Sequence, residues 1–164
     1  LFEWYLKGNI VELVNQDIRF KIIGDKTVFC KKLNDMISQA EKITKNNTGM
    51  KFNVALNYSG KEDILSAVKK ISHQAKSTKL CPNNLGYDDI EKNLMSRNVN
   101  DIDLLIRTSG EQRISNFLLW QISYSELYFT DVLWPDFTNS ELDKAIDFFY
   151  SRIRRFGVSS TGNV

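Results

Sequence analysis

The chain has 164 residues, of which 42% are hydrophobic and 12% aromatic, enough to bury the core of a single domain. Its 22 Lys and Arg against 20 Asp and Glu leave a net charge of +2, too balanced for a protein that neutralises many nucleic-acid phosphates, so any anion site must be local. The two cysteines are far apart in sequence, and the chain has no signal peptide and no apolar run of the roughly 18 residues that span a bilayer. These features predict a reducing, cytoplasmic location. They are compatible with a peripheral membrane contact.

The first half of the chain alternates predicted helices and strands. It opens at Leu1 inside an amphipathic helical pattern without a start methionine, which predicts that further residues precede it. Runs of β-forming residues predict strands at 18–23 and 51–57. An apolar stripe at helical spacing predicts a helix over 29–43, between the two strands. The next predicted helix, 59–75, begins with the Ser and Glu spacing of a capping box.

The second half shows the same alternation after a stretch rich in Pro, Asn and Gly. Its predicted elements are a loop at 77–100 with a short helix around 90–95, a strand at 102–106, a polar turn at 107–113, a helix around 116–121, a strand at 127–129, a helix from Thr138 to Ile153, and a flexible tail at 158–164. Short apolar strands alternating with helices predict a doubly wound α/β fold, with a mainly parallel sheet and helices on both faces, formed by residues 1–164 as one domain. In such folds, ligands bind at the carboxyl ends of the strands.

The polar turn after the third predicted strand has a composition suited to a diphosphate. Arg107 and Arg113 can each make forked hydrogen bonds to phosphate oxygens, Gly110 allows close approach of the backbone, and Ser115 offers a hydroxyl. From composition alone, a solvent-exposed cluster of salt bridges is an equally good interpretation.

The residues around this turn resemble a known family. The stretch 103–137, DLLIRTSGEQRISNFLLWQISYSELYFTDVLWPDF, is similar to the carboxy-terminal signature of undecaprenyl diphosphate synthases, which are cis-prenyltransferases. Residues 22–25, 47–64 and 154–157 resemble the same family in the same order, so the resemblance covers nearly the whole chain. An irregular block of this length is far more specific than a short motif.

The resemblance implies a Mg-dependent enzyme that condenses isopentenyl diphosphate with an allylic diphosphate, expected to be farnesyl diphosphate. The product would be a long-chain polyprenyl diphosphate such as undecaprenyl diphosphate, a cell wall precursor. In this family, residues matching Arg107, Arg113 and Ser115 hold the diphosphate of isopentenyl diphosphate, and the residue matching Glu126 helps to place Mg. A carboxylate suits this hard cation, although Glu126 alone indicates no function.

Near the end of the chain, Arg155 and Gly157 resemble an RxG element that reaches across a homodimer interface in this family. A purely structural interpretation is also open, because cations and a glycine are common where a helix ends.

The family also has an apolar product tunnel, and Phe2, Leu6, Phe52 and Val54 are candidates for its wall. Each would equally serve in an ordinary α/β core. Phe52 resembles a position where the family often has leucine, so its ring is a candidate for shortening the product.

One part of the family pattern is absent. The HxMDGNxRW block with the catalytic aspartate does not occur in the chain, so no catalytic residue is assigned and the 164 residues alone are expected to be inactive. A non-catalytic partner subunit of a cis-prenyltransferase complex is the alternative function, although such subunits typically lose the arginine and serine set. A phosphate-binding domain of a nucleotide-using enzyme is a second alternative, disfavoured because a P-loop and a GxGxxG motif are both missing.

Overall fold

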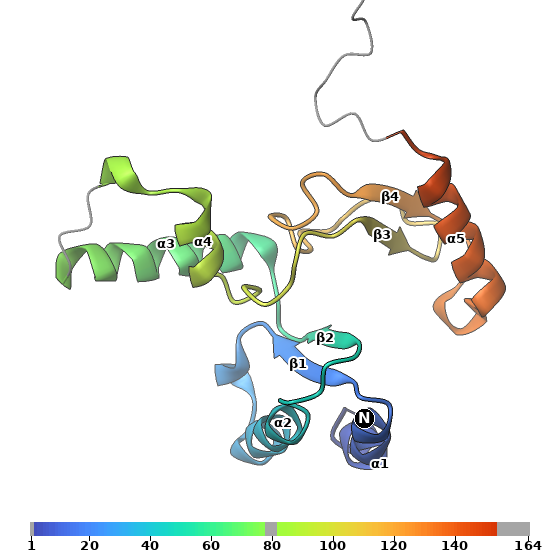
Figure 1. The fold of residues 1–164 in the computed structure, drawn as a ribbon, viewed down its shortest axis with the longest axis horizontal. Helices are drawn as coiled ribbons and strands as arrows, with labels where there is room; N and C mark the ends of the chain where they lie inside the picture. The colour runs from blue at the N-terminus through green and yellow to red at the C-terminus, as the bar shows by residue number, and fades with distance from the viewer. Residues whose placement is uncertain (1, 78–81, 154–164) are drawn as a thin grey trace, which may run out of the picture. The chain divides into compact units, whose positions relative to one another are not determined.

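The computed structural model describes residues 2–77 and 82–153, and the chain divides into two compact units, Leu1–Asn98 and Val99–Val164. The first unit contains α1 (Phe2–Asn15), β1 (Arg19–Ile23), α2 (Lys31–Ile43), β2 (Lys51–Ala55), α3 (Gly60–Ser77) and α4 (Tyr87–Asn93), with 3-10 turns at Lys26–Val28 and Pro82–Asn84 (Figure 1). The second contains β3 (Leu104–Arg107), β4 (Glu126–Phe129) and α5 (Asn139–Ser151), with a 3-10 turn at Trp134–Asp136. The prediction of a mixed α/β fold with parallel strands is confirmed, because β1 pairs with β2 and β3 with β4 in parallel.

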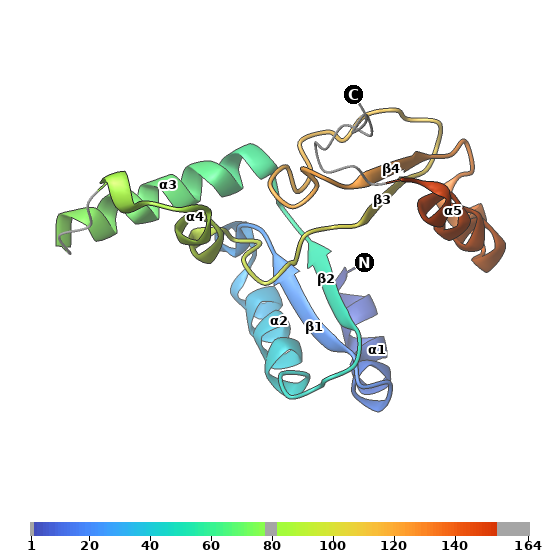
Figure 2. The same cartoon turned by 45° about the horizontal axis from the view of Figure 1, so that its top comes forward.

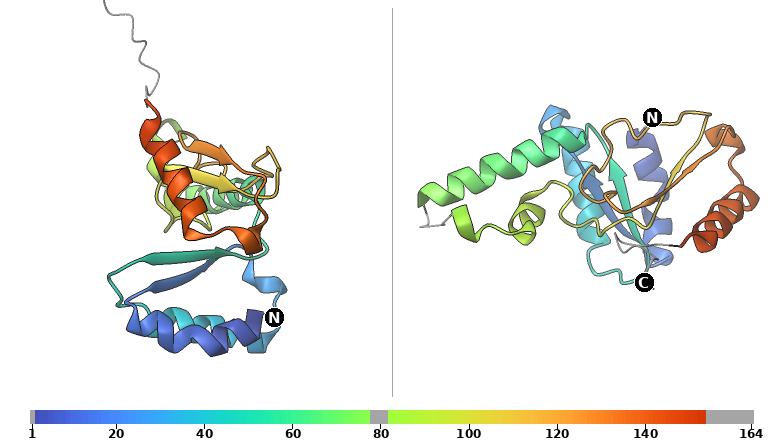
Figure 3. Two further views of the ribbon diagram at one scale, coloured as in Figure 1. Left: turned by 90° about the vertical axis from the view of Figure 1, so that its right-hand side faces the viewer. Right: turned by 90° about the horizontal axis from the view of Figure 1, so that it is seen from above.

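In the first unit, β1 and β2 run side by side in the same direction (Figure 2). α1 and α2 both lie against one face of this ladder (Figure 3), because each helix carries an apolar stripe that is buried there. The buried core consists of Leu6, Leu13, Ile18, Phe20, Ile22, Ile37 and Ala40. The core therefore forms between one helical layer and one ladder.

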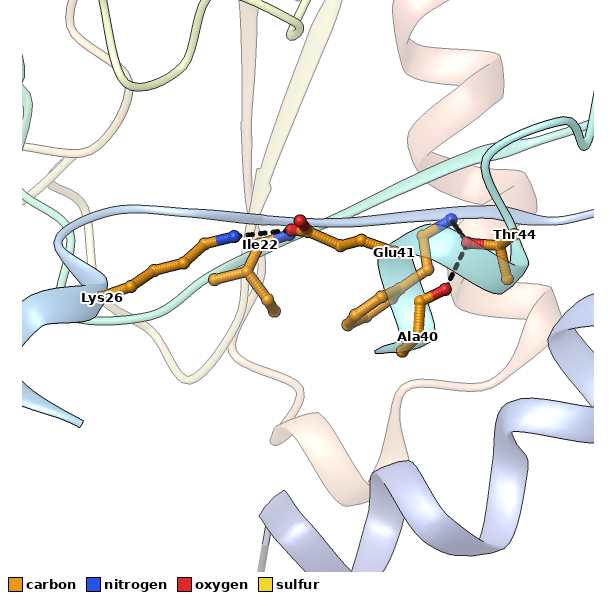
Figure 4. Close-up of polar contacts among 6 residues, drawn as sticks. Ile22, Lys26, Ala40, Glu41 and Thr44 are labelled. Atoms are coloured by element: carbon orange, nitrogen blue, oxygen red, sulfur yellow. Dashed lines mark hydrogen bonds and ion pairs between the residues drawn. The ribbon is translucent and has the colours of Figure 1, made fainter. Parts of the chain in front are cut away.

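The edge of β1 that faces away from β2 is covered by polar side chains from α2 and the turn after it. The amide of Phe20 donates to Thr44 Oγ1 at 3.2 Å, and the amide of Ile22 donates to Glu41 Oε1 at 2.9 Å (Figure 4). Asn47 Nδ2 donates to the carbonyl of Ile18 at 2.8 Å. The three side chains follow one another at intervals of three residues, so one side of α2 and its extension bonds two outward amides of β1 and the carbonyl just before the strand.

The turn after β1 depends on a glycine. Gly24 has φ +119°, a conformation that L side chains rarely adopt. A Cβ at this position would lie 2.1 Å from the carbonyl oxygen of Leu56, in the segment that follows β2. The backbones after the two strands can approach this closely only because residue 24 has no side chain.

A buried carboxylate joins the start of α3 to the segment after α4. Asp63 is 1% exposed and accepts hydrogen bonds from the Tyr58 hydroxyl at 2.9 Å, from the Ser96 amide at 3.3 Å, from the Ser96 hydroxyl and from the amide of Met95. Burial raises the pKa of Tyr58, and the hydrogen bond to Asp63 raises it further. This cluster adds directed polar contacts between segments about 30 residues apart in sequence to the apolar packing of Ala67, Ile71 and Leu94.

In the second unit, α5 packs beside β4 (Figure 1), with Ala145 fully buried and the rings of Tyr128 and Phe148 5.3 Å apart. In the β3–β4 ladder, Leu104 is opposite Glu126 and Arg107 is opposite Phe129. Successive side chains of a strand point to opposite faces, and paired residues share a face. Glu126 and Tyr128 therefore lie on the face that α5 covers.

The prediction of a helix around 116–121 is wrong, because these residues form a series of turns. Ser115, Asn116 and Leu118 have φ values of +48°, +63° and +43°, which break a right-handed helix. Leu118 is 4% exposed, so the apolar pattern marks a buried turn. The helix predicted around 90–95 is α4, which begins and ends a few residues earlier. Among the described residues, no helix combines the length and the apolar character needed to cross a bilayer.

Candidate functional site

The predicted diphosphate-binding turn begins where β3 ends, and two of its three predicted ligands meet. Arg107 is the last residue of β3, and its Nη1 donates to Ser115 Oγ at 3.0 Å. Arg107 is half-buried, whereas Ser115 is exposed. The guanidinium and the hydroxyl thus lie together at the carboxyl end of a parallel strand, where ligands bind in α/β folds.

The backbone around this pair is held in uncommon conformations. Ser109 and Gly110 have φ values near +70°, and Ser115 and Asn116 follow with φ +48° and +63°. The amides of Ser109 and Gly110 each donate at 2.9 Å to carbonyls of the segment 130–132 that follows β4. Non-glycine residues in the left-handed region are costly and cluster at functional sites, so the turn is a preorganised structure rather than a loose loop.

The third predicted ligand has a different partner. Arg113 forms an ion pair with Glu111 of the same turn, and its side chain is 61% exposed. None of the contacts seen among the described residues joins it to Arg107 or Ser115. The structure therefore brings together Arg107 and Ser115, and places Arg113 beside them in sequence with a carboxylate as its counter-ion.

Glu126, the predicted metal ligand, lies at the other end of the β3–β4 ladder. Glu126 pairs with Leu104, which precedes Arg107 by three residues in β3. Glu126 and Arg107 are therefore separated by roughly 10 Å along the strands. By the alternation of side chains, Glu126 and Arg107 also belong to opposite faces. One chain thus does not bring the predicted metal ligand to the Arg107–Ser115 pair.

Arg152 is a residue that the sequence analysis did not identify. It follows the last turn of α5, and its Nε donates to Glu126 Oε2 at 3.3 Å. The side chains are 56% exposed for Arg152 and 20% exposed for Glu126. A contact across 26 residues leaves no local signal in the sequence, and only the general enrichment of cations at helix ends pointed to it.

A divalent cation would find one suitable oxygen ligand on this chain. Within the described residues, no group of three His, Cys, Asp or Glu side chains is arranged to hold a metal ion. Glu126 nevertheless fits as a single ligand, because it is a partly buried carboxylate and its Oε1 takes part in none of the hydrogen bonds seen in the described part of the chain. Mg characteristically completes its shell with water and substrate phosphates.

The other predicted site residues fall into two groups. Arg155 and Gly157 lie outside the described residues. Leu6 is 3% exposed in the core of the first unit, and Phe2, Phe52 and Val54 pack against that core. Phe52 has its ring 6.1 Å from that of Phe20, and Phe2 also lines a hollow of about 550 Å³ beside α1 and α2. These contacts satisfy ordinary core packing, so the tunnel role of the four residues stays a prediction.

Comparison with known proteins gives consistent matches. The model of the family described as "Putative undecaprenyl diphosphate synthase" matches residues 1–157. The chain is 52% identical over 157 residues to a ditrans,polycis-undecaprenyl-diphosphate synthase ((2E,6E)-farnesyl-diphosphate specific) of Buchnera aphidicola subsp. Acyrthosiphon pisum, covering 96% of the chain and 62% of that protein. It is 40% identical over 163 residues to the protein of the same name from Escherichia coli K12, covering 99% and 64%. The chain spans 62% to 65% of the length of the first three such relatives.

Solved structures agree with these matches. A lavandulyl diphosphate synthase from Lavandula x intermedia, in complex with dimethylallyl diphosphate, superposes with a TM-score of 0.89 at 42% identity, covering 95% of this chain and 68% of that one. A probable undecaprenyl diphosphate synthase from Campylobacter jejuni superposes with a TM-score of 0.83 at 31% identity, covering 95% and 71%.

Proposed function

Since the chain belongs to the undecaprenyl diphosphate synthase family of cis-prenyltransferases, we propose that it is part of an enzyme that condenses isopentenyl diphosphate with an allylic diphosphate. The names of the relatives support farnesyl diphosphate as the allylic substrate and undecaprenyl diphosphate as the product. The observation that carries the proposal is the contact of 3.0 Å between Arg107 and Ser115 at the end of β3.

The proposed role of this turn is to hold the diphosphate of isopentenyl diphosphate. Arg107 and Ser115 present donors from one side, and the conformation of the turn fixes them before the ligand arrives. Arg113 is exposed and pairs with Glu111 of the same turn, so it can exchange that carboxylate for phosphate oxygens at low cost. Together the three side chains would supply charge-assisted hydrogen bonds to a group that carries several negative charges.

The proposed reaction is electrophilic. The allylic diphosphate loses pyrophosphate, the double bond of isopentenyl diphosphate attacks the resulting allylic carbon, and a proton then leaves to form a new cis double bond. The turn would keep isopentenyl diphosphate oriented for this attack. An apolar wall would exclude water from the growing chain, and Phe2, Leu6, Phe52 and Val54 are the proposed residues of that wall.

We also propose that Mg²⁺ is the cofactor and that Glu126 is one of its ligands. When bound, the ion neutralises diphosphate charge. The assignment is supported by the position of Glu126, whose carboxylate is partly buried. Its Oε1 makes no hydrogen bond or ion pair with any described residue. Its distance along the ladder from Arg107 means that other groups must link the ion to the diphosphate.

The remaining proposals concern assembly. We propose a cytoplasmic homodimer in which Arg155 and Gly157 contribute to the isopentenyl diphosphate site of the partner, with a peripheral membrane contact for product release. We also propose that the chain folds as one domain around a mainly parallel sheet with helices on both faces; the tail predicted at 158–164 lies outside the described residues. The non-catalytic partner subunit is the alternative function. The intact set of Arg107, Arg113 and Ser115 argues against it.

Steady-state kinetics of the full-length enzyme tests the proposed function. Changing Arg107 to Ala is expected to raise the KM for isopentenyl diphosphate at least tenfold, the effect of losing more than one charge-assisted hydrogen bond, with a much smaller change for the allylic substrate. Lys144→Ala, which removes an exposed cation on α5 paired with Glu141, is the control and should leave both constants unchanged. Equal increases for both substrates would overturn the assignment of the turn.

A further inference from the structure

Arg152 has a defined position although it lies on the surface. Its backbone amide donates to the carbonyl of Phe149 at 3.1 Å, which closes the end of α5. Its guanidinium lies 5.7 Å from the centre of the Phe148 ring, and that ring packs on Tyr128 of β4. A cation over an aromatic face is attracted to it. The side chain is thus held beside Glu126 by contacts that do not involve Glu126.

The pair that Arg152 forms with Glu126 is weak enough to be exchanged. It is a single contact of 3.3 Å through Nε, longer than the usual charge-assisted hydrogen bond and without the forked geometry that makes Arg–carboxylate pairs strong. More than half of the Arg152 side chain is exposed, so water screens the interaction. A divalent cation carries twice the charge and competes for the same oxygens.

We propose that Arg152 is the resident counter-ion of Glu126, and that a divalent cation binds Glu126 by displacing it. The inference rests on the proposed role of Glu126 as a metal ligand. While the metal is absent, the guanidinium neutralises a partly buried carboxylate. When the metal arrives, the guanidinium leaves the carboxylate and stays over the Phe148 ring, where its donors become available to other acceptors. Arg152 therefore sets the affinity for the cation without binding it.

Binding of Mn²⁺ to the full-length enzyme, followed by electron paramagnetic resonance of the free ion, tests the exchange. Arg152→Gln is expected to lower the Kd for Mn²⁺ about two- to fivefold at low ionic strength, because this factor corresponds to the free energy of an exposed ion pair. Arg152→Lys keeps the charge and should bind Mn²⁺ like the unchanged chain. The difference should shrink at 1 M salt, where charges are screened within about 3 Å. Lys144→Gln, which breaks the ion pair with Glu141 on the same helix, should have no effect.

A second measurement follows the guanidinium itself. In nitrogen–proton correlation spectra, the Nε resonance of Arg152 should shift as Mg²⁺ is added, and should not shift in Glu126→Gln. Unchanged or weaker Mn²⁺ binding by Arg152→Gln would overturn the exchange while leaving Glu126 as a ligand, provided that Glu126→Gln still loses binding. If Glu126→Gln binds Mn²⁺ as well as the unchanged chain does, the metal role of Glu126 and the exchange both fail. The kinetic test of Arg107 is independent of either result.

Discussion

Removal of Asp63 should cost the first unit a large part of its stability. Its carboxylate is buried and accepts hydrogen bonds from one hydroxyl of Tyr58, one hydroxyl of Ser96 and the amides of Met95 and Ser96. Ser96 is fully buried as well, so its donors have no access to water when the acceptor is lost. Asp63→Ala removes all four contacts in one step.

The size of the effect follows from the number and type of these bonds. A hydrogen bond to a charged group contributes about 1.5–3 kcal/mol, and a buried donor left without its acceptor costs about 1–3 kcal/mol. Because these terms overlap within one cluster, their sum overstates the effect. We therefore expect Asp63→Ala to lower the free energy of unfolding by about 3–5 kcal/mol. Asp63→Asn keeps the shape but turns an amide donor towards other donors, and should cost about 2 kcal/mol.

Urea unfolding followed by circular dichroism measures these differences as shifts of the midpoint at constant slope. Asp88→Ala is a matched control, because Asp88 lies on the surface of α4 with Lys92 as a distant partner at 3.9 Å. It should leave the midpoint unchanged. If Asp63→Ala lowers the free energy of unfolding by less than about 1 kcal/mol, the carboxylate does not hold α3 to the segment after α4, and the reasoning from the cluster is wrong.

Three further predictions concern stability and product length. Because the pKa of Tyr58 is raised in the folded state, its contribution to stability is full below about pH 10 and is lost as the pH rises above that value. The free energy of unfolding, measured between about pH 9 and 11.5, should therefore fall with pH in the unchanged chain, and this fall should be absent in Tyr58→Phe. A fall that persists in the Phe variant would contradict the assignment. Gly24→Ala should destabilise the chain by more than about 2 kcal/mol in urea unfolding, whereas Gly8→Ala, which meets no atom within 4 Å, should be neutral or stabilising; similar values for the two would refute the argument from close approach. Phe52→Leu in the full-length enzyme should shift products to longer chains in thin-layer chromatography, and an unchanged distribution would remove Phe52 from the proposed tunnel wall.

The elements that sequence patterns located best are those whose signal is periodic. The helix expected over 29–43 appears as α2 (Lys31–Ile43), and the strand expected at 18–23 appears as β1 (Arg19–Ile23). In both, the buried residues belong to the predicted apolar pattern: Ile37 and Ala40 in α2, and Phe20, Ile22 and Ile23 in β1. The stretch 116–121 has a comparable apolar content, yet its backbone is set by residues in the left-handed region, which a pattern of hydrophobicity does not record.

The site was predicted to the extent that its residues are close in sequence. Arg107 and Ser115 are eight residues apart, and both were expected from the composition of the turn and from the family signature. The contact of Glu126 with Arg152 spans 26 residues, and that of Asp63 with Ser96 spans 33. Such pairs form because packing brings distant segments together, and neither member carries a local pattern that identifies the other.

The covered edge of β1 has a consequence for how the chain can associate. An uncovered strand edge is a template on which another chain can form hydrogen bonds, and this is one origin of aggregation. Thr44 and Glu41 already accept from the outward amides of Phe20 and Ile22, and Asn47 donates to the carbonyl of Ile18 just before β1, so an incoming strand would have to displace three intramolecular partners. Intermolecular pairing is therefore discouraged on this side, and any extension of the ladder is directed to the outer edge of β2.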